Sequence, residues 1–277
     1  MVERFKRQPY VMGYELMNEP WPGAVWEPCV LDPAGCPDIE QASLVPFYRK
    51  ATTAVRALTR TQPVYVEPFV LFNFGQSPTS LPGAGTRNVL SFHSYALDPA
   101  GEQAVVDNAV AAAERDQAPL VATEFGATMD VPTLERLTGQ LDSAIVSWMF
   151  WAYNEEIVTD RDEPASLDTV RSVDTFKALV RPYPLAVAGT PTSTRFDPAT
   201  RVYDLTYGTR RPDGRRHRAN IDTLVSIPAL QYPDGYTVEV RGARVTSDPC
   251  ASTLTLRTRS RRVDEVTVHI TPGGDCA

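Results

Sequence analysis

Over its first 184 residues the chain alternates short apolar segments with amphipathic ones, and few architectures accommodate that pattern. Helices are predicted where apolar residues recur near a 3.6-residue period, and strands where apolar residues run together. The predicted strands are Tyr10–Met17, Val64–Phe69, Asn88–Tyr95, Pro119–Glu124 and Ser143–Trp151, and the predicted helices are Ser43–Thr59, Glu102–Asp116, Pro132–Asp142 and Val170–Val180. Strands that alternate with helices in this way favour parallel βα units, hence an α/β fold.

The pattern changes after Pro182-Tyr183-Pro184. Short alternating runs, separated by Asp-Gly and Pro-Gly turns, then follow at Arg201–Tyr207, Tyr236–Arg241, Ser252–Thr258 and Val263–Ile270. This pattern of alternating runs and turns is typical of antiparallel strands in a small β-sandwich. We therefore predict two domains, residues 1–184 with βα units and residues 185–277 with a sandwich. The composition, 43% hydrophobic and 22% charged, is that of an ordinary globular chain with ample core material.

Charge is distributed unevenly along the chain. The formal net charge of the chain is −7. The last 93 residues hold 13 arginines, no lysine and 10 acidic residues, a net charge of +3, so the first 184 residues have a net charge of −10. An acidic chain of this kind is not expected to bind nucleic acid. The arginines form two clusters, namely Arg210, Arg211, Arg215, Arg216 and Arg218, and Arg257, Arg259, Arg261 and Arg262. They are interpreted either as solvated turns and one strand face or as a contact with a membrane surface or acidic sugars.

The four cysteines form two local sets, Cys29 with Cys36 and Cys250 with Cys276. This arrangement fits two disulfides, with free buried thiols as the alternative. Disulfides favour an oxidising compartment, so the full-length protein is expected to be secreted or extracytoplasmic, although no signal peptide is visible after Met1. The His and Cys spacing of a zinc site is absent from the sequence, and neither a metal nor another cofactor is expected.

Polar and aromatic residues stand where the predicted strands end. Asn18-Glu19 follows the first strand, His93 and Tyr95 end the third, Glu124 ends the fourth and Trp151 ends the fifth. The carboxyl ends of parallel barrel strands converge on one face, which is where barrel enzymes place their active sites. Glu19 and Glu124 would therefore face each other, and a pair of carboxyl groups is what glycoside hydrolysis requires.

The ordered set Asn18-Glu19-Pro20, His93-x-Tyr95, Glu124-Phe125-Gly126 and Trp151 resembles glycoside hydrolase family 5. The stretch Gly13-Tyr14-Glu15-Leu16-Met17-Asn18-Glu19-Pro20-Trp21-Pro22-Gly23, followed by Cys29 and Gly35-Cys36-Pro37, is similar to the endoglycoceramidase branch of that family. Members of this branch have a TIM barrel with catalytic glutamates on strands four and seven and a sandwich behind it. The resemblance thus implies strands four to eight of a (β/α)8 barrel, followed by a small antiparallel β-sandwich.

The resemblance implies a role for each matching residue. Glu19 would be the general acid and base, and Glu124 the nucleophile of a double displacement that retains configuration, with the carboxyl groups roughly 5 Å apart. Tyr95 would hydrogen-bond Glu124. The other expected substrate-binding residues are Asn18 at the sugar 2-hydroxyl, His93, and Trp151 as a platform beneath the sugar. Trp21 and Trp26 are candidates for the aglycone side.

The implied function is hydrolysis of the bond between oligosaccharide and ceramide in glycosphingolipids. An alternative is a β-glucosidase that acts on glucosylceramide or a steryl glucoside, and another is a non-catalytic protein that binds glycolipid or carbohydrate. Only about ten residues precede the strand that would be strand four, so strands one to three are absent and this chain is expected to have little activity. A mis-called start, a fragment and a protein that pairs with another chain all fit that observation.

Overall fold

The computed structural model describes residues 1–32, 35–75, 79, 81, 88–152, 173–217, 221–260, 262–274 and 276. The chain divides into two compact units. The first unit contains Met1–Ala127 and Val146–Trp151, and the second contains Thr128–Ile145 and Ala152–Ala277. No helix in the described part of the chain combines the length and apolar character that a membrane span requires.

The first unit is built on a five-stranded sheet whose strands are all parallel. Its spatial order is the chain order, β1 (Tyr14–Glu15), β2 (Val64–Val66), β3 (Asn88–Ser94), β4 (Leu120–Phe125) and β5 (Ser147–Trp148). Sequential parallel strands are the arrangement of a barrel wall. The central strand β3 is buried along its whole length. The predicted parallel βα architecture is confirmed, although β1 and β5 are shorter than predicted.

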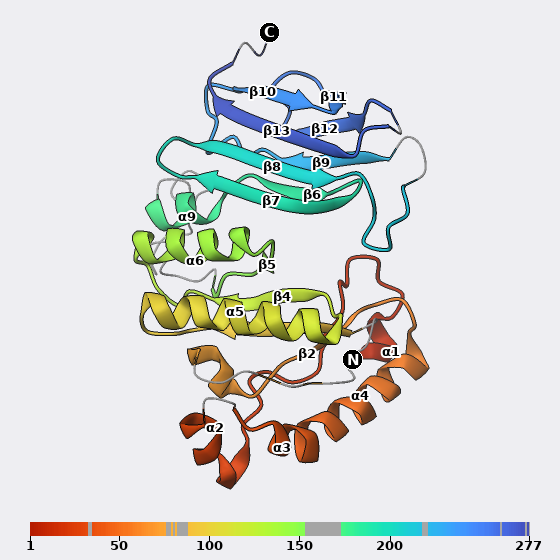
Figure 1. The fold of residues 1–277 in the computed structure, drawn as a ribbon, viewed down its shortest axis with the longest axis vertical. Helices are drawn as coiled ribbons and strands as arrows, with labels where there is room; N and C mark the ends of the chain where they lie inside the picture. Colours follow the sequence, from red (N-terminus) through yellow and green to blue (C-terminus); the bar gives the residue numbers. More distant parts are fainter. Residues whose placement is uncertain are drawn as a thin grey trace. The chain divides into compact units, whose positions relative to one another are not determined.

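Helices cover this sheet and supply its core. α4 (Val45–Leu58) contacts β2, and α5 (Pro99–Asp116) contacts β3 and β4 (Figure 1). α5 begins three residues before its predicted start because Asp98 Oδ1 accepts the N–H groups of Ala100 and Gly101. The shorter helical segments are α1 (Val2–Phe5), η1 (Gly23–Val25), α2 (Glu27–Leu31), α3 (Pro37–Ile39), η2 (Glu40–Leu44) and η3 (Val70–Phe74).

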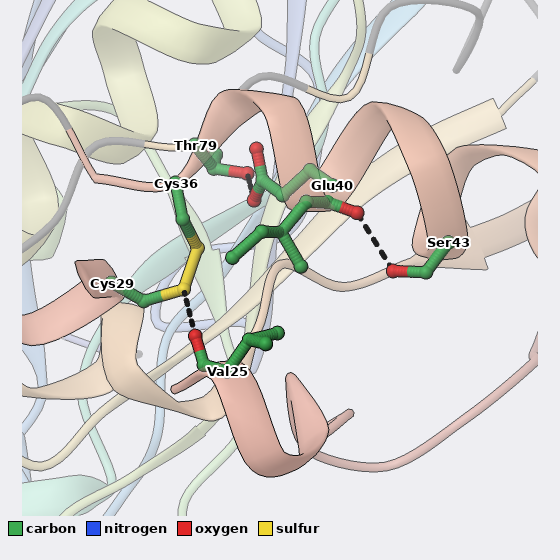
Figure 2. The surroundings of a disulfide bond; sticks show 7 residues. Val25, Cys29, Cys36, Glu40, Ser43 and Thr79 are labelled. Carbon is green, nitrogen blue, oxygen red and sulfur yellow. Dashed lines mark hydrogen bonds between the residues drawn. A yellow bond between two sulfur atoms is a disulfide. The ribbon is translucent and has the colours of Figure 1, made fainter. Parts of the chain in front are cut away.

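A disulfide joins Cys29 of α2 to Cys36, just before α3, as Figure 2 shows. Both cysteines are buried, and Cys29 Sγ also contacts the carbonyl oxygen of Val25. Beside the bridge, the buried carboxylate of Glu40 accepts a 2.7 Å hydrogen bond from the Thr79 hydroxyl. The predicted pairing is therefore confirmed over free thiols.

The second unit contains two four-stranded antiparallel sheets. Their orders are β10-β13-β8-β7 and β11-β12-β9-β6. The bounds are β6 (Tyr183–Ala186), β7 (Thr190–Asp197), β8 (Val202–Gly208), β9 (Asp222–Ser226), β10 (Tyr236–Arg241), β11 (Ala243–Val245), β12 (Thr253–Thr258) and β13 (Glu265–Pro272). Alternate residues of β8 are buried, including Tyr203, Leu205 and Tyr207, as expected for a strand with one face in the core. The predicted sandwich is confirmed, and Cys250 pairs with Cys276 as expected.

The described residues of the second unit include two helices. α6 (Val131–Ser143) contacts β7 and α9 (Asp174–Leu179). The predicted helix at 170–180 begins at residues outside the described ones, and α9 is its described part. The second unit thus draws helical segments from before residue 184, and the domain boundary at that residue stays a prediction.

Candidate active site

Charged side chains gather at the carboxyl ends of four neighbouring strands of the first unit. Glu19 follows β1, Glu67 follows β2, His93 lies in β3 and Glu124 in β4. A register shift between Phe92 and His93 makes His93 the partner of Glu124 across the two strands. Such a bulge re-aims a side chain, and it brings these two residues level with each other.

Glu19 is held from both its main chain and its side chain. Its backbone adopts a φ of 46°, which is uncommon outside glycine, and its N–H donates a 2.6 Å hydrogen bond to Glu67 Oε2. Asn73 Nδ2 donates a 2.8 Å hydrogen bond to Glu19 Oε1, which also lies 3.0 Å from His93 Nδ1. The side chain is nevertheless 32% exposed, so a ligand could reach the carboxylate.

Glu124 lies near Glu19, at the same ring nitrogen of His93. Tyr95 Oη donates a 2.8 Å hydrogen bond to Glu124 Oε2, and His93 Nδ1 lies 3.3 Å from the same oxygen. One carboxylate oxygen of Glu19, one of Glu124 and a ring nitrogen of His93 all lie within 4.8 Å of one another. Burial and the hydrogen bond to Glu124 raise the pKa of Tyr95 above its ordinary value, so the phenol stays protonated and remains a donor.

His93 is almost completely buried and is the centre of the cluster. Its Nε2 lies 2.5 Å from Glu67 Oε1, a close ion pair that lacks the alignment of a hydrogen bond. Burial lowers the pKa of His93, but Glu67, Glu19 and Glu124 outweigh it and raise the pKa to about 9. Metal binding requires a neutral imidazole nitrogen, so a metal in either of the described carboxylate–histidine groups that contain His93 would have to displace a proton from it.

The predicted aromatic residues lie in the same unit. Trp151 is 54% exposed and is anchored through its main chain, whose carbonyl accepts the N–H of Ala127 at 2.8 Å. Trp148 and Phe150 both pack against Phe125, as strand alternation predicts for residues on the face opposite Trp151. The predicted role of Trp151 as a platform beneath the sugar stays a prediction.

The segment after Glu19 carries further exposed groups. Asn18 is exposed immediately before it. Trp21 and Trp26 lie with their ring centroids 5.9 Å apart, and they are 54% and 40% exposed. The predicted roles of Asn18 at the sugar and of the two indoles at the aglycone stay predictions.

Two residues of the cluster were not among the predicted site residues. Glu67 follows β2 directly. From the sequence alone, a single carboxylate at the end of a strand fits an ordinary ion pair as well as it fits a functional site. Asn73 lies in the short helix η3, which no periodic pattern in the sequence predicts. It is positioned by a contact between distant loops, in which Val70 N–H donates to the carbonyl oxygen of Pro20 at 2.9 Å.

The basic clusters of the second unit are partly neutralised. Arg210 and Arg216 both contact Asp264, and Arg257 makes a bidentate pair with Asp222 at 2.7 Å. Arg218 and Arg261 lie outside the described residues. Contact of this unit with a membrane surface stays a prediction.

Comparison with known proteins matches both parts of the chain. The family model "Cellulase (glycosyl hydrolase family 5)" matches residues 1–156, and the "Glycoside hydrolase family 5 C-terminal domain" matches residues 181–271. Endoglycoceramidase I of Rhodococcus hoagii is 32% identical over 279 residues, covering 92% of this chain and 53% of that protein. The chain spans about half the length of the curated relatives it matches.

Solved structures share the fold. Endo-glycoceramidase II from Rhodococcus sp., in complex with a cellobiose-like imidazole, superposes with a TM-score of 0.76 at 24% identity, over 99% of this chain and 62% of that one. Sterylglucosidase 1 of Cryptococcus neoformans gives 0.61 at 13% identity, over 83% and 43%. The predicted fold class, part of a TIM barrel followed by a sandwich, is thereby confirmed. With both family 5 models matched along its length, the chain belongs to glycoside hydrolase family 5.

Proposed function

We propose that the chain carries the catalytic pair of a retaining endo-β-glycosidase that separates oligosaccharide from ceramide in glycosphingolipids. The observation that carries the proposal is the spacing of Glu19 and Glu124, which have carboxylate oxygens within 4.8 Å of each other. Retaining glycosidases need carboxyl groups about 5–5.5 Å apart, whereas inverting enzymes leave about 6.5–9.5 Å for a water molecule. The short spacing supports attack by a protein carboxylate.

The reaction then proceeds in two displacements. Glu124 Oε attacks the anomeric carbon and forms a glycosyl ester, while the Glu19 carboxylic acid donates its proton to the glycosidic oxygen and ceramide leaves as an alcohol. In the second step the Glu19 carboxylate accepts a proton from water, which attacks the same carbon and releases Glu124. Two inversions restore the original configuration at that carbon.

The cluster provides what each carboxylate needs for these steps. The Tyr95 hydrogen bond fixes the direction of the Glu124 carboxylate, and a nucleophile needs to be held in line with the carbon that it attacks. The Asn73 and His93 contacts fix the direction of the Glu19 carboxylate, which remains partly accessible for proton transfer. The exposed indole of Trp151 supports a stacking surface for a sugar ring.

The choice of glycosphingolipid is supported by the relatives, which bear the name endoglycoceramidase. The two exposed indoles of Trp21 and Trp26, on the segment that follows Glu19, suit a partly apolar aglycone. Two disulfides also support a secreted or extracytoplasmic protein.

The test combines hydrolysis with covalent trapping. The purified chain is incubated with fluorescent lactosylceramide, and released ceramide and lactose are measured; a 2-deoxy-2-fluoro-lactoside carrying an activated leaving group is used to trap the ester. Trapping registers a single turnover, so it detects slow chemistry. We expect a mass increase of one 2-deoxy-2-fluoro-lactosyl group on the peptide that contains Glu124, absent in Glu124→Gln and retained in the control Glu114→Gln on the exposed face of α5.

The outcomes separate this function from its alternatives. Release of lactose and ceramide supports an endoglycosidase, whereas turnover of glucosylceramide or a steryl glucoside alone supports a β-glucosidase. Binding to glycolipid vesicles that persists in Glu19→Gln and Glu124→Gln, without trapping or hydrolysis by the unmodified chain, would indicate a non-catalytic binding protein and overturn the proposal.

A further inference from the structure

Glu67 is a buried carboxylate whose main chain is fixed from the opposite side by α4. Tyr48 Oη donates a 2.8 Å hydrogen bond to the carbonyl oxygen of Glu67 and accepts the Glu67 N–H at 3.1 Å. The residue is only 2% exposed. A buried carboxylate is costly unless it has partners, so the groups that face its two oxygens should explain its presence.

The two oxygens of Glu67 face two different residues of the cluster. Oε2 accepts the N–H of Glu19, the residue with the left-handed backbone, and Oε1 lies 2.5 Å from His93 Nε2. The opposite ring nitrogen, Nδ1, lies 3.0 Å from Glu19 Oε1 and 3.3 Å from Glu124 Oε2. His93 thus stands between Glu67 and the proposed catalytic pair.

We propose that Glu67 is a positioning residue that keeps His93 as an imidazolium and fixes the main chain of Glu19, so that the proposed acid and nucleophile share one N–H donor. The proposal rests on the proposed function for the roles of Glu19 and Glu124. A neutral imidazole has one N–H and could serve only one side of the ring, whereas the imidazolium has donors on both nitrogens. Carboxylate oxygens lie on both sides of the ring, in an ion pair with Glu67 at Nε2 and beside Glu19 and Glu124 at Nδ1.

Other charged and titratable groups face His93 as well. Glu15 of β1 has a carboxylate oxygen within 4.8 Å of the Glu67 and His93 ligand atoms, and the Tyr95 ring lies 6.1 Å from the imidazole centroid. With Glu19 and Glu124, the described surroundings of His93 are carboxylates and a neutral phenol. This agrees with the pKa of His93 of about 9, in which burial is outweighed by the carboxylates, Glu67 first.

The direct test is the protonation of His93 in solution, measured on the full chain by NMR of its imidazole nitrogens. The sequence holds three histidines, so His217→Gln and His269→Gln suffice for assignment. We expect a doubly protonated His93 at pH 7.5, with a titration midpoint near 9, and a midpoint at least one unit lower in Glu67→Gln. Glu40→Gln, the matched removal of another buried carboxylate in the same unit, should leave the midpoint unchanged.

A neutral His93 at pH 7.5 in the unmodified chain would overturn the proposal, even if Glu67→Gln failed to fold. A midpoint that stays within a few tenths of a unit in folded Glu67→Gln would also overturn it. These readouts need no turnover, so they decide the role of Glu67 even if the chain hydrolyses no glycoside and the proposed function fails.

Kinetics test the positioning step itself. We expect Glu67→Gln to lower kcat about 100-fold with little change in KM, since misplacement of a catalytic group by about 1 Å costs that much. Asn73→Ala removes a different hydrogen bond to Glu19, so it should lower kcat while leaving the His93 midpoint in place. Full kcat in Glu67→Gln, alongside a lowered His93 midpoint, would contradict the positioning role.

Discussion

The phenol of Tyr95 donates a 2.8 Å hydrogen bond to Oε2 of Glu124, the carboxylate oxygen that also faces His93. Tyr95 is anchored for this contact by its own N–H, which donates to the carbonyl oxygen of Asn73 at 2.9 Å. Strand β3 and the residue that follows it therefore place a fixed phenol donor and a buried imidazole on one side of Glu124.

We expect Tyr95→Phe to slow formation of the covalent ester about 10- to 100-fold. A hydrogen bond to a charged group contributes about 1.5–3 kcal/mol, and the variant removes only the hydroxyl. The rate of trapping by the fluorinated lactoside measures this step, and Tyr183→Phe, at an exposed tyrosine of the second unit, is the control. Trapping at the unmodified rate in Tyr95→Phe would mean that the phenol does not support the nucleophile.

The His93 cluster predicts a loss of stability at alkaline pH. The pKa of His93 is about 9 in the folded chain, above the ordinary value of about 6.5 expected after unfolding. Its contribution is therefore fully present below about pH 6.5 and is lost as the pH rises through about 9, with a size of about 3 kcal/mol at most. The side chain is 1% exposed, so solvent screening should reduce this little.

The measurement is urea unfolding of the unmodified chain and of His93→Gln at pH 6 and at pH 10. The stability difference between the two proteins should shrink at the higher pH, because only the unmodified chain has the imidazolium to lose. An equal difference at both values would show that His93 is not charged in the folded state.

The strand-end residues could be predicted because their convergence depends only on topology. Parallel strands in chain order bring Glu19, His93 and Glu124 to one edge whatever the loops between them do. The contact of Asn73 with Glu19 could not be predicted in this way. It depends on a hydrogen bond between two loops about 50 residues apart in the sequence. The pairing of His93 with Glu124 was equally unpredictable, because it depends on a bulge in β3.

The elements that sequence patterns did not single out have a similar explanation. β9 (Asp222–Ser226) and β11 (Ala243–Val245) have few residues over which alternation could be recognised. They are strands because their partners in the sheet supply hydrogen bonds, with β12 between them. The early start of α5 was, in contrast, readable from the cap at Asp98 and from Pro99 in the first turn.

Removal of the bridge between Cys29 and Cys36 should destabilise the first unit without unfolding it. The sequence separation is 7 residues, for which loop-closure entropy predicts about 2.5 kcal/mol. Urea unfolding of Cys29→Ser/Cys36→Ser measures the loss. The bridge from Cys250 to Cys276 spans 26 residues, and its double serine variant should lose about 3.5 kcal/mol by the same reasoning. Equal stability with and without the first bridge would contradict this expectation.

Arg181 forms a buried ion pair with Asp142 in the second unit. Its side chain is 4% exposed, and Nη2 lies 2.6 Å from Asp142 Oδ2. The guanidinium also donates to Thr138 and to the carbonyl oxygen of Phe196, and it lies over the Phe196 ring. Burial lowers the pKa of Arg181, and the carboxylate of Asp142 opposes that shift. The pair therefore joins α6 to the start of the antiparallel sheets.

Asp142→Asn should destabilise the second unit by about 3 kcal/mol, because it leaves a buried cation without its counter-ion. The double variant Arg181→Met/Asp142→Leu removes both charges and should lose less than the single one, since well-packed apolar residues often replace a buried pair at little cost. Asp174→Asn breaks an exposed pair with Lys177 and serves as the control, with an expected change of about 0.5 kcal/mol. Urea unfolding of the three variants gives these values. A double variant less stable than Asp142→Asn would show that Arg181 stabilises the unit through contacts other than its charge pair.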